Sequence, residues 1–159
     1  GKNRSGGYVP SLMRYHARWR ENTHQFGPQT KLVMLMGEYM TQAYGGIYYA
    51  KAQNLRARLT AAYEAAFEQY DLLLMPTLPL VAPPVPPADA PPEEIVARAL
   101  EMVPNTPAFD LTGHPSISVP CGKVDDLPVG LMLTGRQFDE MTVYRAAHCF
   151  EQAVNWETC

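Results

Sequence analysis

The sequence predicts an α/β fold in which helices cover a sheet of short strands. Apolar residues recur at spacings of three and four over several segments, which is typical of helices that bury one face. Short apolar runs at 71–75, 116–120 and 128–134 lie between turn residues, as buried strands do. The helical faces at 48–66 and 143–154 need an apolar surface to cover, so we expect the three strands to share one sheet.

The first part of the chain predicts two helices that each follow a proline. A helix is expected from Ser11 to Trp19, with Pro10 at its entry, and Pro28 suits the first turn of a second helix. His16 lacks partners at metal-ligand spacing and is interpreted as a surface or partly buried side chain. The apolar side of the second helix comprises Leu32, Leu35, Met36 and Tyr39.

The longest periodic segment runs from Thr41 to Tyr70 and predicts a long helix. Gly45 and Gly46 weaken its first turns by roughly 1 kcal/mol each relative to alanine. They indicate either a close helix contact or a break. The expected apolar face comprises Tyr48, Ala52, Leu55, Leu59, Ala62 and Ala66. The opposite, solvated side is expected to hold Lys51, Arg56, Arg58 and Glu64.

A strand and a proline-rich crossover follow this helix. Asp71 to Met75 is a continuous apolar run, which favours a strand buried on both faces. The segment Pro76 to Pro92 holds eight prolines, so it forms neither a regular helix nor a central strand. We expect an extended surface crossover; the alternative is a ligand for a peptide-binding domain. Helical character returns at Glu93 to Val103, with Pro91 or Pro92 near the first position.

The stretch from Asn105 to Gly135 predicts one or two helical turns followed by two strands. Gly113 suits the left-handed residue that ends a helix. Pro115 and Pro120 bracket the first strand and are expected to keep its ladder short. The turn between the strands is expected at Asp125, Asp126 and Pro128.

The last predicted helix begins after Asp139, whose side chain can cap its first turn. Its apolar residues recur at helical spacing and are expected to face the sheet. They are Val143, Ala146, Ala147, Phe150 and Val154.

Composition narrows the class of protein. The chain has 159 residues, 47% of them hydrophobic and 18% charged, which is typical of one globular domain. Its net charge of −3 and lack of a basic run argue against nucleic acid and anionic membranes as partners. No apolar stretch reaches transmembrane length. The chain begins at Gly1 without a methionine, and GKNRSGG predicts a loop, so we expect a piece of a longer protein.

The three cysteines, Cys121, Cys149 and Cys159, are odd in number and widely spaced. This argues against a disulfide framework and a zinc site and favours a reduced, cytoplasmic setting. Neither a metal nor another cofactor is expected. Cys121 is interpreted as a small buried residue; the competing interpretation makes it a nucleophile with His114 as its base, which requires hydrogen-bond reach between them.

Three segments of the chain read FDLTGHPSISVPCG, LPVGLMLTGRQFDE and AAHCFEQA. They resemble the C-terminal part of amidase-signature enzymes, which are serine amidohydrolases. Two further segments, YYAKAQNLRARLTAAYEAAFEQYDLLLMPTLP and NTPAFDLTGHP, are similar to the amidases encoded near nitrile hydratases. The resemblance covers most of residues 28–153. It implies that residues 1–159 are the C-terminal portion of one domain, built on a mixed sheet flanked by helices.

The resemblance implies hydrolysis of carboxylic amides to acid and ammonia by a Ser–Ser–Lys mechanism. In the family these residues lie in a Gly/Ser-rich segment upstream of the matched part, so the N-terminal catalytic portion is expected outside this chain. The RSGG around Ser5 lacks the second serine, and no catalytic residue is assigned here. The lysines at 2, 31, 51 and 123 are interpreted as surface residues. A non-catalytic interaction or scaffold chain remains the alternative.

The resemblance also implies a substrate pocket, because the family segment that matches Phe109 to Pro115 lies near the acyl-binding side. Phe109 would supply apolar shape, while Asp110 or Thr112 would either hold the loop or contact the amide. Tyr44 and Tyr48 are weaker candidates. The expected pocket residues are Thr106, Phe109, Asp110, Thr112 and His114. The expected partners are a small amide substrate, the missing N-terminal portion and a second copy in a homo-oligomer.

Overall fold

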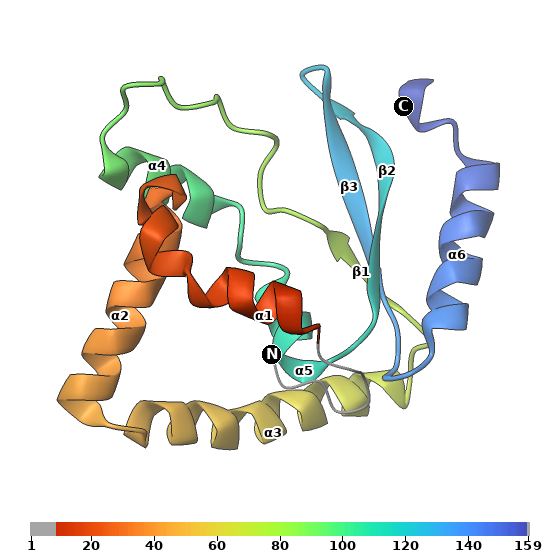
Figure 1. The fold of residues 1–159 in the computed structure, drawn as a ribbon. Helices are drawn as coiled ribbons and strands as arrows, with labels where there is room; N and C mark the ends of the chain where they lie inside the picture. Colours follow the sequence, from red (N-terminus) through yellow and green to blue (C-terminus); the bar gives the residue numbers. More distant parts are fainter. Residues whose placement is uncertain (1–8, 159) are drawn as a thin grey trace.

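The computed structural model describes residues 9–158, which form helices around one three-stranded sheet (Figure 1). The fold class is therefore α/β, as predicted. In chain order the elements are α1 (Pro10–Ala17), the 3₁₀ segment η1 (Trp19–Gln25), α2 (Pro28–Tyr44), α3 (Ile47–Phe67), β1 (Leu73–Pro76), α4 (Pro92–Glu101), α5 (Pro107–Thr112), β2 (Ser116–Val124), β3 (Leu127–Thr134), α6 (Glu140–Ala153) and the 3₁₀ segment η2 (Trp156–Thr158).

Prolines start three of the helices where the sequence predicted them. Pro10, Pro28 and Pro92 each occupy the first turn, where the missing N–H has no intrahelical partner. α5 ends at Gly113, whose φ of +76° is the left-handed conformation expected there. α1 ends at Ala17 rather than Trp19, and the chain continues as η1.

The glycine pair divides the longest periodic segment into two helices. α2 ends at Tyr44 and α3 begins at Ile47, so the predicted single helix from Thr41 is wrong in its extent. Gly45 has φ +59° and ψ −140°, a conformation that essentially only glycine adopts. A Cβ at Gly45 or Gly46 would meet nothing within 4 Å. The pair is thus a break and not a close helix contact.

The three predicted strands share one sheet in the order β1-β3-β2, with both pairings antiparallel. β2 is longer than predicted, because it continues through Pro120 to Val124. The register shifts between Pro120 and Gly122, so Cys121 is the extra residue of a bulge. Proline is tolerated here because β2 is an edge strand, where an N–H can be missing.

The turn and the first strand also differ in detail from the prediction. Asp125 and Asp126 alone form the turn, with φ of 51° and 62°, values typical of a two-residue hairpin loop. Pro128 belongs to β3 and pairs with Lys123, beyond the part of β3 that β1 covers. β1 is an edge strand rather than one buried on both faces, and Leu74 is 62% exposed.

The core lies between the sheet and α6, as predicted for the inner face of this helix. Val119 and Leu133 from the strands pack against Val143 and Ala147 from α6. The Asp139 side chain accepts a hydrogen bond from the Thr142 backbone N–H at 3.4 Å, which confirms the expected cap. The partly buried residues around the cluster are Leu72, Ile117, Leu131, Ala146 and Phe150.

α3 buries a different face from the predicted one. Tyr48 and Leu55 are 50% and 48% exposed, whereas Phe67 at the C-terminal end is 1% exposed. Only the last turns of α3 lie against α5 and the start of β2, so Tyr63, Glu64 and Phe67 make the contacts (Figure 1). Glu64 was expected on the solvated side and is half-buried instead.

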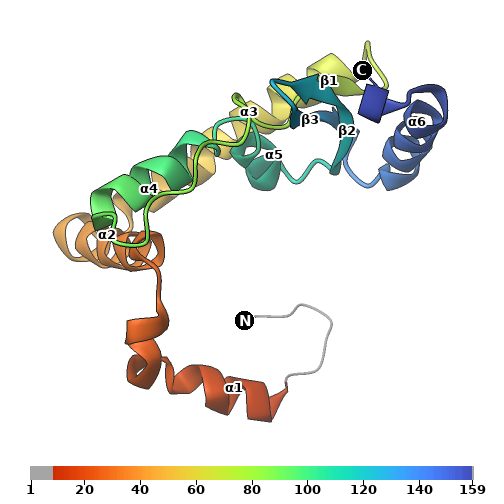
Figure 2. The same cartoon turned by 90° about the horizontal axis from the view of Figure 1, so that it is seen from above.

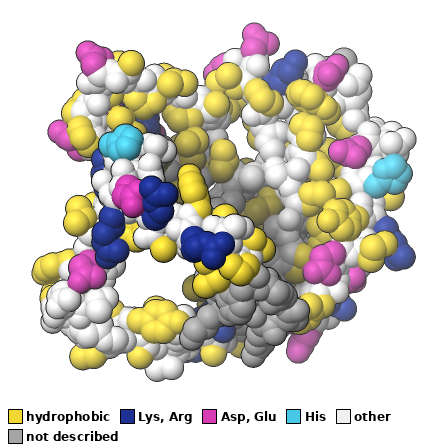
Figure 3. All heavy atoms as spheres, in the orientation of Figure 1, with side chains coloured by type: hydrophobic (Ala, Val, Ile, Leu, Met, Phe, Trp, Pro, Cys, Tyr) yellow, Lys and Arg dark blue, Asp and Glu magenta, His cyan; other side chains and the backbone are white. Residues whose placement is uncertain are grey.

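The described chain is open in shape. Seen from above, its elements extend in an arc from α2 to α6, and α1 stands apart from the sheet (Figure 2). The face in Figure 3 carries many hydrophobic side chains and has an opening between α2 and α3. The accessible surface is 12035 Å². A compact monomer of 17.7 kDa would expose about 7,900 Å², so a large excess of surface is uncovered.

Candidate functional site

α5 and the start of β2 form one wall of the candidate site. Phe109 is 4% exposed, and its ring lies 5.1 Å from that of Tyr63 on α3. The side chain of Asn105 donates to the Pro76 carbonyl at 2.8 Å and ties the segment before α5 to the end of β1. The wall is therefore attached to both α3 and the sheet.

A hollow of about 280 Å³ lies between α5 and the sheet face that α6 does not cover. It brings together four of the five predicted pocket residues, Thr106, Phe109, Asp110 and His114. Phenyl and thioether groups share the hollow with hydroxyl groups, which suits a small ligand with an apolar and a polar end. The other lining residues are Thr77, Ser116, Ile117, Ser118 and Met132.

Thr112, the fifth predicted residue, does not line this hollow. It is 5% exposed, and its hydroxyl donates to the Ala108 carbonyl at 2.9 Å. Its own carbonyl accepts a hydrogen bond from Gln137 Nε2 at 2.5 Å. These contacts support the loop-holding role and place Thr112 behind the wall. Asp110, in contrast, is exposed.

A second, larger hollow of about 670 Å³ lies on the other side of the wall. Asp110 lines both hollows, while Glu64 and Thr112 line only the larger one. This surface is mostly polar and separates α3 from α5. The remaining lining residues are Gln53, Arg56, Ala57, Thr60, Ala61, Leu111, Gly113 and Gln137.

The hydroxyl groups in the smaller hollow were not predicted. Thr77 Oγ1 and Ser118 Oγ lie 2.5 Å apart, and Ser116 Oγ lies 2.8 Å from Thr134 Oγ1. Alternation along β2 puts Ser116 and Ser118 on the face opposite Val119. The S-I-S pattern is a sequence signal for this face, but the pairing with β1 that brings in Thr77 is not readable from it.

His114 is held between α3 and α5. Its side chain is 0% exposed. Nδ1 lies 2.7 Å from Thr112 Oγ1, and Nε2 lies 3.2 Å from Glu64 Oε1. The rings of Phe67 and Tyr63 lie 5.2 and 5.7 Å from the imidazole. The histidine is therefore a buried polar group with both nitrogens paired.

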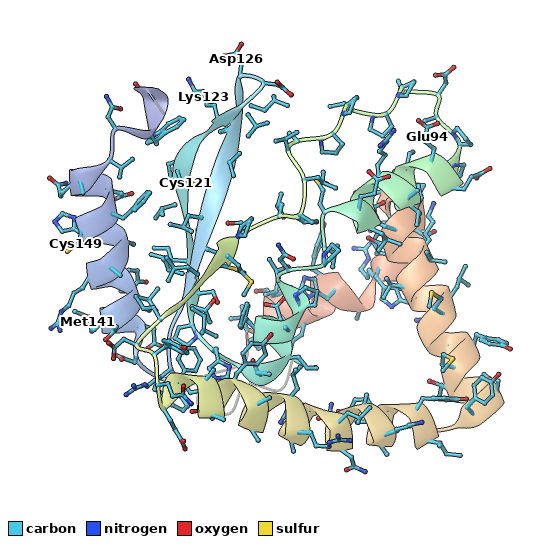
Figure 4. The ribbon with its side chains drawn as sticks, turned by 180° about the vertical axis from the view of Figure 1, so that it is seen from behind. Glu94, Cys121, Lys123, Asp126, Met141 and Cys149 are labelled. Atoms are coloured by element: carbon cyan, nitrogen blue, oxygen red, sulfur yellow. The ribbon has the colours of Figure 1, made fainter. Side chains whose placement is uncertain are left out.

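The competing Cys121–His114 pair is not formed. The thiol of Cys121 donates to the Val129 carbonyl at 3.4 Å, and both nitrogens of His114 have other partners. Figure 4 shows Cys121 on the β2–β3 hairpin and Cys149 on α6. The geometry supports the interpretation of Cys121 as a half-buried structural residue.

The remaining sequence candidates lie elsewhere. Tyr44 and Tyr48 pack edge to face at 5.0 Å beside the glycine break, and both are exposed. The lysines at 31, 51 and 123 are exposed, as predicted. Ser5, the lysine at position 2 and Cys159 lie outside the described residues.

Metal ligands and membrane-spanning helices can be judged over residues 9–158. In this part of the chain no group of three or more His, Cys, Asp and Glu side chains is arranged to hold a metal ion. Within the same range, none of the helices has the length and apolar content needed to cross a membrane.

Helices packed around a sheet, with a small mixed apolar and hydroxyl hollow, define a small-molecule-binding α/β unit. The family model for amidases matches residues 8–144. The chain belongs to the amidase family, known by its amidase signature, and the family expectation is confirmed.

Individual relatives agree with this assignment. A protein from the nthA 5′ region of Rhodococcus erythropolis is 44% identical over 153 residues, covering 96% of this chain and 77% of the relative. An enantioselective amidase from Rhodococcus rhodochrous is 42% identical over 156 residues, covering 97% and 30%. The crystal structure of a glutamyl-tRNA(Gln) amidotransferase subunit from Thermotoga maritima is 27% identical, with a TM-score of 0.59 and coverage of 89% and 31%. The chain thus spans under a third of the two named enzymes.

Proposed function

We propose that this chain is the C-terminal portion of an amidase that hydrolyses carboxylic amides to acid and ammonia. The family match over residues 8–144 is the observation that carries the proposal. The 42% identity to an enantioselective amidase supports it. The Ser–Ser–Lys residues that break the amide bond lie in the N-terminal portion of the same domain, outside residues 1–159.

The smaller hollow is the proposed binding site for the acyl part of the amide. Phe109, Ile117 and Met132 would contact the apolar group, and the hydroxyls of Thr77 and Ser118 would face its polar end. The volume of about 280 Å³ suits a small aliphatic or aromatic amide better than a long chain. The wall is completed by Thr106, Asp110 and His114, with Thr112 behind it.

The partners follow from the same proposal. The N-terminal portion would cover much of the excess surface, and a second copy could cover more of it in a homo-oligomer. Cys121 and Cys149 are free thiols, which supports a reducing, cytoplasmic setting.

The test compares the native polypeptide that carries this sequence with residues 1–159 alone. Both are assayed against acetamide, propionamide and benzamide. We expect turnover only in the native polypeptide, because loss of the nucleophile costs a serine hydrolase on the order of 10⁶-fold. A native polypeptide that hydrolyses no amide would favour the scaffold alternative. Turnover by residues 1–159 that disappears in Cys121→Ala would instead make this a cysteine enzyme.

Phe109→Leu tests the hollow in the same assay. The smaller side chain should raise KM for benzamide about tenfold more than KM for acetamide, because apolar contact with the aromatic ring is lost. Phe138→Leu is the matched control, since Phe138 is 90% exposed and lies outside both hollows. Equal effects of the two substitutions on benzamide would reject the proposed site.

A further inference from the structure

The hydrogen bonds of His114 determine how many protons its ring carries. The Thr112 hydroxyl has one hydrogen, which it donates to the Ala108 carbonyl at 2.9 Å. Its oxygen must then accept from His114, so Nδ1, at 2.7 Å, carries a proton. An ionised Glu64 only accepts, so Nε2, at 3.2 Å, carries a proton as well. Every bond is satisfied at once only by the doubly protonated imidazolium.

We propose that Glu64 and His114 are positioning residues, and that their ion pair sets the wall of the acyl-binding hollow. This inference rests on the proposed function. The pair links α3 to the α5–β2 junction across 50 residues of sequence. His114 also contacts Thr112, the last residue of α5, and α5 carries Phe109 and Asp110 into the hollow. Neither Glu64 nor Thr112 lines the hollow, so they act through this wall.

The burial of the pair makes the link specific. The imidazole is fully buried, and a buried charge needs a charged or strongly hydrogen-bonded partner. The Glu64 side chain is 44% exposed and faces the larger hollow, so water reaches the carboxylate and lowers its desolvation cost. The other titratable or charged groups around His114 are Tyr63 and Arg56 on α3 and Asp110 on α5.

The link depends on pH in a defined direction. It is present while His114 is protonated and Glu64 is ionised. Deprotonation of the ring as the pH rises places a nitrogen lone pair opposite the carboxylate and removes the attraction. Protonation of Glu64 in acid removes it from the other side. KM should therefore rise at alkaline pH in the native protein, and this dependence should be lost when the charge of Glu64 is removed.

The first measurement is the ¹⁵N chemical shift of the two His114 ring nitrogens in the native polypeptide at neutral pH. We expect both to have the value of protonated nitrogen. In Glu64→Gln the amide keeps a hydrogen bond but loses the charge, so one nitrogen should become unprotonated at the same pH. A neutral ring in the unsubstituted protein overturns the ion pair without any variant that might unfold.

The second measurement is the kinetics of Glu64→Gln, with Glu68→Gln as the matched control one turn along α3, where the carboxylate is exposed. We expect Glu64→Gln to raise KM about fivefold with kcat changed less than twofold, and Glu68→Gln to leave both unchanged. Equal KM in the two variants overturns the positioning role. If the native protein hydrolyses no amide, the proposed function fails, and the ring shifts alone decide whether the ion pair exists.

Discussion

Gly130 illustrates how a single missing side chain opens the candidate hollow. A Cβ at this position of β3 would lie 2.7 Å from both Ser118 Oγ and Thr77 Oγ1 and 3.2 Å from Thr77 Cβ. The two hydroxyls bond to each other across the glycine. Any side chain on Gly130 would therefore separate them and narrow the hollow.

Gly130→Ala is expected to lower the free energy of unfolding by about 1–3 kcal/mol, because the strands must shift to accept the methyl group. Urea denaturation of the native polypeptide measures the change. Gly37→Ala is the control, since a Cβ there meets nothing within 4 Å. In the interior of α2 it should raise stability by up to about 1 kcal/mol. Unchanged or increased stability of Gly130→Ala would contradict the close approach seen here.

The predicted and observed site residues differ in a way that has a physical cause. Phe109, Asp110 and His114 were predicted because they lie in one short segment that resembles the family. Thr77 and Ser118 were missed, because they are 41 residues apart and are brought together by strands that both pair with β3. Such a pair depends on strand order and register, which local patterns do not specify.

At the level of the elements, the glycine break decides where α2 ends and α3 begins. Gly45 has φ +59°, whereas Gly46 has φ −88° and ψ 4°, values open to any residue. The two neighbouring glycines therefore have different reasons to be there. Only the first is required by the backbone conformation.

Alanine substitutions should separate the two positions. Gly45→Ala is expected to destabilise the protein by about 1–3 kcal/mol, because alanine is strained at this φ and ψ. Gly46→Ala should stabilise it by about 0.4–1 kcal/mol through the lower entropy of the unfolded chain. Thermal unfolding followed by circular dichroism compares them. A common sign for both changes would show that the break is not set by Gly45.

At the scale of the whole molecule, the accessible surface decides how the chain behaves alone. It exceeds the about 7,900 Å² of a compact monomer by roughly 4,000 Å², more than the roughly 1,200–2,000 Å² of a standard protein–protein interface. Exposed side chains on α2 and α3 contribute to it, among them Val33, Leu35, Ile47 and Tyr49.

Residues 1–159 alone are expected to self-associate or to be marginally stable, because uncovered apolar surface and open strand edges promote association. Light scattering over a range of concentrations should give a mass above 17.7 kDa that rises with concentration. The native polypeptide is the comparison, since its N-terminal portion should cover this surface. A monodisperse and thermally robust monomer of residues 1–159 would contradict the expectation.

The sequence by itself determined the features that depend on neighbouring residues. The helix starts at Pro10, Pro28 and Pro92, the left-handed end at Gly113 and the cap at Asp139 are all local, because each follows from the φ preference or hydrogen bonding of one residue. The existence of three strands was equally readable from their apolar runs.

Only the tertiary structure decided which surfaces meet. The apolar periodicity of α3 indicated a face through Tyr48 and Leu55, yet the packed residues are those opposite α5, and Glu64 finds its partner at His114. β2 continues through Pro120 because its outer edge needs no donor there. In each case the deciding contact joins segments far apart in the chain, so its energy depends on how the elements are arranged and not on the local sequence.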